Sequence, residues 1–281
     1  MGPDRSPVGF CAARTHAFGM DVLLTNDDGI SATGIHALHE SLSELADVTV
    51  VAPRRDQSAV GRQLSRRVTV EEHELGYVVD GTPTDCVIAG VQALSLDPDL
   101  VVAGCNRGAN LGHYVLGRSG TVSAAVEAAF LGLPAMAVSL YFPGTDVAYE
   151  SFDPGAEDYG EAARAASYLA DHAFGAGVFD DADYLNVNAP LPPEEGHAEM
   201  ETTRPSHVYD MDAEDDGDDG IRIVDRIWER MATGDLADPD GTDRRTVVEG
   251  RVSVSPLTAP HTTQHHDALD GLAEAYRSAG D

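Results

Sequence analysis

Two adjacent carboxylates follow the first apolar stretch of the chain. Val22 to Leu24 is an aliphatic run typical of a buried parallel strand, and Asp27 and Asp28 come soon after it, before Gly29. Like charges side by side at such a strand end are costly unless a cation or hydrogen bonds compensate them. Because Mg²⁺ and Mn²⁺ prefer carboxylate ligands, we expect a metal site here; a helix N-cap, which needs no metal, is the alternative.

Polar side chains also gather in two later loops. The first loop, at 54–67, carries Ser58, and the second, at 104–112, has three glycines together with Asn106 and Asn110. The glycines allow close approach of the backbone, and the Asn side chains are suited to coordinating a metal or hydrogen-bonding phosphate oxygens. The spacing matches neither the dinucleotide-binding nor the P-loop pattern. For Ser58 the simpler interpretation is a turn or cap serine.

A third feature is the run Ser119-Gly120-Thr121, which precedes a segment rich in small apolar residues and predicts the start of a helix. A helix N-terminus offers free N–H groups and the positive end of a dipole, so it can bind an anion. Two hydroxyl groups beside it would add donors. An ordinary Ser/Thr cap explains the same residues equally well.

These residues must be positioned by a regular fold. Apolar runs alternate with segments of helical periodicity over residues 20–190, which predicts right-handed crossovers. The expected class is α/β, a three-layer, Rossmann-like, mainly parallel sheet, whose ligand crevice lies at the carboxyl ends of the strands. The expected strands are Val22–Leu24, Val48–Ala52, Val68–Val70, Tyr77–Val79, Leu100–Ala103, Ala135–Leu140 and Tyr184–Asn188.

The two ends of the chain differ from this core of residues 20–190. Residues 1–19 lack periodicity and predict a loose extension, while 191–281 predict a β-hairpin and a terminal helix. We expect the hairpin to pair 221–228 with 246–254 and the acidic run 210–219 to be a solvated loop. Because a ribbon and a helix are marginal alone, this C-terminal segment is expected to pack on the core or on another subunit.

Composition limits the function. The net charge is −30, from 48 acidic and 18 basic residues, and every basic residue is arginine. This composition suits a surface adapted to high salt and argues against binding nucleic-acid polymers or anionic membranes. The three cysteines, Cys11, Cys86 and Cys105, have no metal-binding spacing and fit a reducing cytoplasm. No apolar run approaches the length of a membrane span.

Taken together, the motifs resemble the SurE family, the survival-protein nucleotidases. The resemblance covers about residues 20–260 and depends on the order and separation of several short motifs. They are Thr25-Asn26-Asp27-Asp28-Gly29, Ala52-Pro53 with Gln57-Ser58, Gly81-Thr82-Pro83, Asn106 to Gly112, Ser119 to Val122, and Gly250 to Leu257.

The resemblance implies a metal-dependent phosphomonoesterase that acts on nucleoside 5′-monophosphates, and on 3′-monophosphates as well. It implies one divalent cation per subunit, Mg²⁺ or Mn²⁺, and a homodimer or homotetramer that exchanges C-terminal segments. By resemblance, Asp27 and Asp28 are the catalytic residues. The implied metal ligands are Asp27, Asp28, Ser58 and Asn106, and the implied phosphate-binding residues are Asn110, Ser119, Gly120 and Thr121.

One departure from the family pattern bears on the substrate. Arg118 stands where the family has an aromatic residue before Ser-Gly-Thr, so contacts with phosphate or base are expected to differ. Three further functions stay open: a broader phosphatase that also cuts short polyphosphate or sugar phosphates, a non-catalytic nucleotide-binding module, and an acidic interaction protein that docks through 210–219. The module would need a GxGxxG turn after the first strand, where this chain has Asn-Asp-Asp-Gly.

Overall fold

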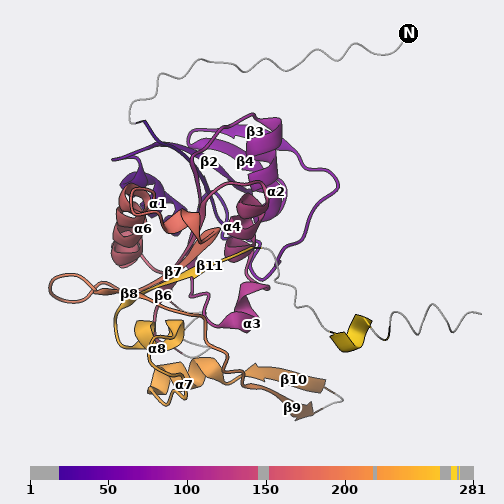
Figure 1. The fold of residues 1–281 in the computed structure, drawn as a ribbon, viewed down its shortest axis with the longest axis vertical. Helices are drawn as coiled ribbons and strands as arrows, with labels where there is room; N and C mark the ends of the chain where they lie inside the picture. The colour runs from indigo at the N-terminus through magenta and orange to yellow at the C-terminus, as the bar shows by residue number, and fades with distance from the viewer. Residues whose placement is uncertain (1–18, 145–151, 218–219, 260–266, 271, 273–281) are drawn as a thin grey trace, which may run out of the picture.

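The computed structural model describes residues 19–144, 152–217, 220–259, 267–270 and 272. The expected N-terminal extension and most of the expected terminal helix lie outside these residues. The described chain forms a large twisted sheet between two layers of helices, with a narrow two-stranded ribbon projecting from one end (Figure 1). The expected α/β class with a mainly parallel sheet is confirmed.

The main sheet has nine strands in the order β3-β4-β2-β1-β5-β6-β7-β11-β8. The six from β4 to β7 in this order run parallel, and the other three are antiparallel to them at the edges. The strands are β1 (Asp21–Thr25), β2 (Asp47–Pro53), β3 (Val70–His73), β4 (Gly76–Val79), β5 (Leu100–Arg107), β6 (Ala135–Tyr141), β7 (Tyr184–Pro190), β8 (Met200–Thr202) and β11 (Val252–Leu257).

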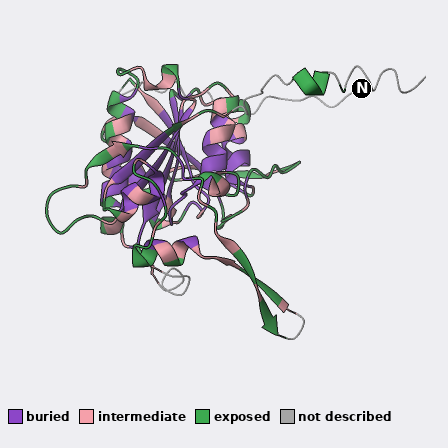
Figure 2. Ribbon diagram, turned by 60° about the horizontal axis from the view of Figure 1, so that its bottom comes forward, coloured by how far each residue is buried: buried purple, intermediate pink, exposed green. Residues whose placement is uncertain are grey.

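Helices cover both faces of this sheet. One face is covered by α1 (Thr33–Leu42) and α6 (Gly160–His172), and the other by α2 (Pro83–Ile88) and α4 (Gly120–Phe130). The strands between them form the buried centre in Figure 2. Helix α1 packs so closely that a Cβ added at Gly34 would lie 2.1 Å from the carbonyl oxygen of Cys105.

Shorter helical segments complete the fold. Within the described residues, no helix is long and apolar enough to cross a membrane. These segments are η1 (Ala89–Ala93), α3 (His113–Leu116), η2 (Ala156–Tyr159), η3 (Val178–Asp180), α7 (Ile227–Thr233) and α8 (Asp243–Val248).

The strand order creates a crevice beside β1. The chain passes from β1 to β2 and β4 on one side, then returns to β5 on the other side. Crossover connections therefore leave the carboxyl ends of β1 and β5 in opposite directions, and ligands bind at such a point in open α/β sheets. The carboxylates that follow β1 and the amides at the end of β5 are brought to this edge.

The expected pairing in the C-terminal segment is wrong. The acidic run 210–219, expected as a solvated loop, contains strand β9 (Met211–Gly217), which pairs with β10 (Gly220–Asp225) to form the projecting ribbon. One arginine on the second strand and one just after it explain why an acidic run can be a strand. Arg222 contacts Glu214 at 2.6 Å, and Arg226 contacts the same residue at 2.5 Å.

The remaining parts of the expected pair have other structures. Residues 227–233 form helix α7. Residues 246–248, expected to begin the second strand, are instead the end of helix α8. Strand β11 does not join the ribbon, because it pairs with β7 and β8 and so extends the main sheet beyond residue 190. It is an interior strand of the sheet, and its first four residues, 252–255, are all buried.

A buried carboxylate ties this C-terminal segment to the crevice. The Asp243 side chain is fully buried and accepts hydrogen bonds from the backbone N–H groups of Gly112, at 2.7 Å, and Ser206, at 2.9 Å. Next to it, Arg244 is also buried. Its guanidinium donates to the Val208 carbonyl at 2.8 Å and lies 3.6 Å from an oxygen of buried Asp238.

We expect Arg244→Met to lower the free energy of unfolding by about 3–5 kcal/mol, because it leaves the Asp238 carboxylate buried without its partner. The double variant Arg244→Met/Asp238→Leu should recover most of the loss, since an apolar pair of similar volume replaces the ion pair. Denaturant unfolding in molar KCl measures both. Arg55→Met, in an exposed ion pair with Asp80, is the matched control and should change stability little; an equal effect of both Met variants would contradict this interpretation.

Candidate active site

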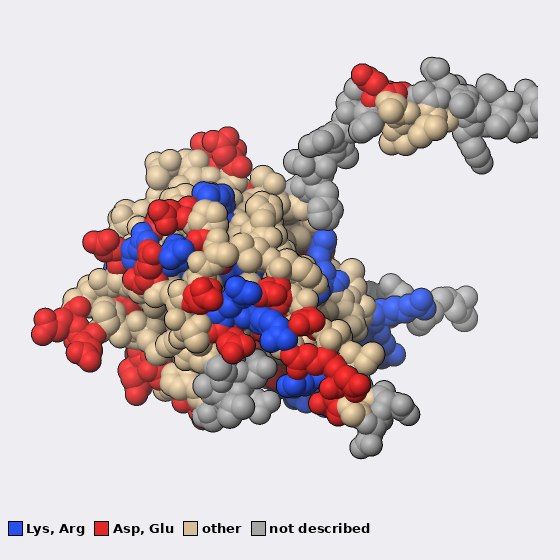
Figure 3. All heavy atoms as spheres, turned by 90° about the horizontal axis from the view of Figure 1, so that it is seen from below, with Lys and Arg blue, Asp and Glu red and all other residues tan. Residues whose placement is uncertain are grey.

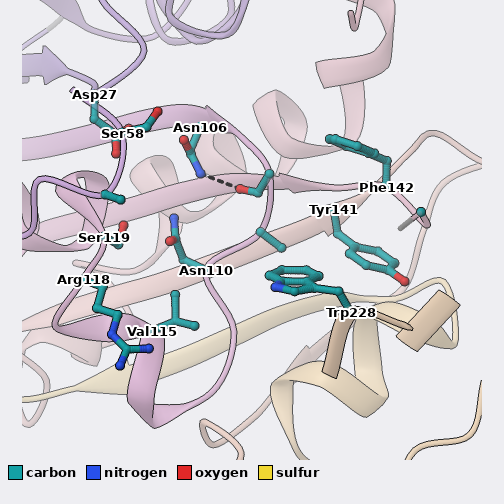
Figure 4. Close-up of a pocket in the computed structure, with 14 residues that line it drawn as sticks. Asp27, Ser58, Asn106, Asn110, Val115, Arg118, Ser119, Tyr141, Phe142 and Trp228 are labelled. Atoms are coloured by element: carbon teal, nitrogen blue, oxygen red, sulfur yellow. Dashed lines mark hydrogen bonds between the residues drawn. The ribbon is translucent and has the colours of Figure 1, made fainter. Parts of the chain in front are cut away.

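A cavity of about 350 Å³ opens at the carboxyl ends of β1 and β5. It lies in the size range of small-molecule sites. Five of the residues expected to bind metal or phosphate line it together, although they are up to 92 positions apart in the chain (Figure 4). They are Asp27, Ser58, Asn106, Asn110 and Ser119.

The start of α4 positions Asp27. One carboxylate oxygen accepts a hydrogen bond from the Thr121 hydroxyl at 2.5 Å, and the other accepts one from the Thr121 backbone N–H at 3.1 Å. Gly120 makes this approach feasible, since a Cβ there would lie 2.8 Å from Asp27 Oδ2. Both hydrogen-bond donors of Thr121, its hydroxyl and its backbone N–H, therefore bind Asp27. The donors of Ser119 and Gly120 do not bind Asp27.

Burial dominates the electrostatics of both carboxyls. It raises the pKa of Asp27 to about 7, with a further rise from the Asp28 charge that the Thr121 hydrogen bonds offset only in part. The pKa of Asp28 is also raised by burial, although it accepts a hydrogen bond from the Arg107 backbone N–H at 2.9 Å. Asp28 lines an adjoining hollow rather than the cavity that Asp27 lines, and Ser58 borders both.

An additional carboxylate orients Ser58. Asp56 Oδ1 accepts hydrogen bonds from both the backbone N–H and the hydroxyl of Ser58, at 2.7 and 2.6 Å. Because the hydroxyl proton points to Asp56, the oxygen lone pairs remain for a cation. Asp56 also raises the pKa of Asp28 through its charge. The sequence analysis did not identify Asp56, although its position two residues before Ser58 is typical of an Asx turn.

An irregularity in β5 directs Asn106 into the cavity. Pairing with β6 is regular as far as Ala103 and resumes at Asn106, with the two residues between them out of register. Such irregularities change the direction of side chains at strand ends. The side-chain nitrogen of Asn106 donates to the Gly108 carbonyl at 2.6 Å, so its oxygen is the atom left for a cation (Figure 4).

Asn110 is fixed by a buried polar framework that the sequence analysis missed. Its backbone N–H donates to Asn188 Oδ1 at 2.8 Å, and its carbonyl accepts from the side chain of Asn186 at 2.9 Å. Its own side chain donates to Ser139 at 2.9 Å. All three partners are completely buried in β6 and β7. Two asparagines in the otherwise apolar strand Tyr184–Pro190 were the available signal.

The other side of the cavity is apolar. Tyr141, Phe142 and Trp228 line it, opposite the carboxylate, while Val115 lies near Arg118 (Figure 4). Arg118 also lines the cavity, and its guanidinium lies 5.3 Å from the centre of the Tyr114 ring. Arg118 was noted in the sequence as unusual, but the aromatic lining residues, which come from two separate segments, were not predicted.

The donor set suits a hard cation. Within the described residues, no three His, Cys, Asp or Glu side chains converge as a metal cluster, so the site combines two carboxylates with neutral oxygens. The raised pKa values of Asp27 and Asp28 show that the protein's own donors do not compensate two negative charges fully. A divalent cation among oxygen donors would supply that compensation.

Comparison with known proteins agrees with the fold. Residues 22–211 match the family model described as Survival protein SurE. The 5′-nucleotidase SurE of Natronomonas pharaonis is 71% identical, over 92% of this chain and 100% of its own length. That of Haloarcula marismortui is 64% identical, over 91% of this chain and 94% of its own.

The architecture is shared as well. The crystal structure of the SurE protein from Aquifex aeolicus aligns with a TM-score of 0.70 at 32% identity, covering 93% of this chain and 100% of that one. With a family match over most of its length and relatives at this level of identity, the chain belongs to the SurE family.

Proposed function

We propose that the chain is a metal-dependent phosphomonoesterase that hydrolyses nucleoside 5′-monophosphates, and 3′-monophosphates as well, to nucleoside and phosphate. The observation that carries this proposal is the gathering of Asp27, Ser58 and Asn106 with Asn110 and Ser119 around one cavity. Relatives named 5′-nucleotidase support the same activity. The aromatic side of the cavity favours a nucleotide over a phosphate ester without a base.

One divalent cation, Mg²⁺ or Mn²⁺, would be held by the carboxylates of Asp27 and Asp28 and the neutral oxygens of Ser58 and Asn106. When bound, it supplies Lewis-acid polarisation of a phosphoryl oxygen and activation of a water molecule. Asp27 and Asp28 would be catalytic residues because they would hold the cation that polarises the phosphoryl group. The chain's own contribution is to hold these four side chains in place through Thr121, Arg107, Asp56 and Gly108.

Three hydrogen-bond donors would hold the phosphate. Asn110 uses one proton of its amide on Ser139 and has a second to donate. The Ser119 hydroxyl oxygen accepts from the Val122 N–H at 3.1 Å, which leaves its proton for an anion. The Gly120 N–H lies at the first position of α4, where the helix dipole favours negative charge. Thr121 acts through Asp27.

We also propose a homodimer or homotetramer in which C-terminal segments are exchanged between cytoplasmic subunits. Ile221 and Ile223 on the projecting ribbon are 74% and 65% exposed. Strands β9 and β10 pair with each other, and such a hairpin is marginally stable alone. An apolar face on a projecting ribbon is typical of a contact with another chain.

The first test is phosphate release from a panel of nucleoside monophosphates in molar KCl. EDTA should stop the release, and Mg²⁺ or Mn²⁺ should restore it, because the two carboxylates need the cation. Polyphosphate and sugar phosphates in the same panel distinguish a broader phosphatase. If folded protein releases no phosphate with any metal, the chain is a binding module and the proposal fails.

Asp27→Asn should reduce metal-dependent activity by at least about 100-fold, since even the outer partners of metal ligands cost about 10- to 100-fold. The protein should stay folded, because an amide can still accept from the Thr121 N–H and donate to its hydroxyl. Asp97→Asn is the matched control: it is exposed and lies before β5, at the opposite edge of the sheet. Full activity in Asp27→Asn would refute the metal assignment.

The raised pKa of Asp27 predicts a pH dependence in metal-free protein. A carboxyl whose folded pKa of about 7 exceeds its unfolded value of 3.8 stabilises the fold at low pH, and this contribution is lost as the pH rises to about 7. In EDTA, wild type should therefore lose stability between pH 5 and pH 8 relative to Asp27→Asn, which has no carboxyl to titrate at this position. The difference between their unfolding free energies should change by about 2–3 kcal/mol in favour of the variant. Denaturant unfolding at both pH values measures this difference; a constant difference would show that Asp27 does not titrate in this range.

A further inference from the structure

The cavity has two chemically different sides. Asp27, Asn106 and Ser119 lie on one side, and Tyr141, Phe142 and Trp228 lie on the other (Figure 4). A phosphate needs only the polar side. The apolar side therefore requires another part of the ligand, and an aromatic surface recognises a flat, weakly polar group such as a nucleobase.

The fold holds Trp228 firmly while leaving part of its surface open. Its neighbour Ile227 is 1% exposed and packs with Met231 and Tyr141 in a separate small core. The backbone N–H of Ile227 donates to Asp225 at 3.0 Å, and the Tyr114 hydroxyl donates to the same carboxylate. Trp228 itself is half-buried against this core and lines the cavity.

We propose that Trp228 forms a wall of the nucleobase subsite, so that the C-terminal segment supplies a specificity residue to the active site. The inference rests on the proposed nucleotidase function. Stacking of a base on an aromatic side chain typically changes affinity by about 5- to 150-fold. Purines have the larger face, and so nucleotides with purine bases are favoured over those with pyrimidines.

The chain contains one tryptophan, which makes the proposal directly measurable. The metal-loaded protein is titrated with adenosine, AMP, ribose 5-phosphate and inorganic phosphate while the intrinsic fluorescence is recorded. Adenosine and AMP should change the Trp228 emission with saturation. Ribose 5-phosphate and inorganic phosphate, which reach the polar side alone, should leave it unchanged.

Kinetics then separate a base contact from a structural role. Trp228→Leu should raise KM for AMP by about 5- to 150-fold and leave kcat/KM for ribose 5-phosphate within about twofold. Trp228→Phe should recover most of the loss, because a ring is restored. Tyr168→Leu, a half-exposed aromatic on α6 away from the cavity, is the matched control and should change neither substrate.

Two results would overturn the inference without touching the nucleotidase proposal: no fluorescence change at saturating AMP while hydrolysis proceeds, or an equal loss for AMP and ribose 5-phosphate in Trp228→Leu. If Trp228→Leu does not fold, the fluorescence titration and Trp228→Phe decide the question. Absence of hydrolysis for every phosphate ester would instead refute the proposed function, and adenosine binding would still report on the Trp228 contact.

Discussion

Two neighbouring carboxylates at the end of a buried strand set the conditions for the rest of the structure. Burial raises the pKa of both Asp27 and Asp28, and a nearby carboxylate adds to the rise in each case: Asp28 acts on Asp27, and Asp56 acts on Asp28. The fold compensates by bringing the start of α4 against β1, close enough that only a glycine fits at position 120. The compensation is partial. In the proposed function, a divalent cation would supply the compensation that the fold does not.

Placing these groups requires polar residues inside the sheet. Ser139, Asn186 and Asn188 are buried in strands that would otherwise be apolar, and each bonds to Asn110. A buried hydrogen-bond network of this kind rigidifies the structure around it. The loop at 104–112 is thus held by two sets of hydrogen bonds. Asn110 is bound by side chains of the sheet, and Gly112 is bound by Asp243.

Local patterns predicted the core well because its strands are short aliphatic runs between glycines and prolines. The same patterns brought five candidate side chains to one cavity, since parallel strands end at one edge. They failed in the C-terminal segment, where pairing depends on distant partners: the acidic strand β9 needs Arg222 and Arg226 opposite it, and β11 needs the open edge of β7. Asp56 and Trp228 were missed for a related reason, because neither belongs to a motif whose spacing carries its role.

The projecting ribbon has a consequence for assembly. Within the described part of the chain, its two strands pair only with each other, so their outer edges are sites for pairing with other sheets. Strand β9 carries four carboxylates among seven residues. The face in Figure 3 shows carboxylates across its width with arginines among them. At low ionic strength such charges repel another copy; at about 1 M salt, where the Debye length falls to about 3 Å, that repulsion is short-ranged and Ile221 and Ile223 can make contact. If the proposed contact between subunits uses this ribbon, that contact should strengthen as the salt concentration rises.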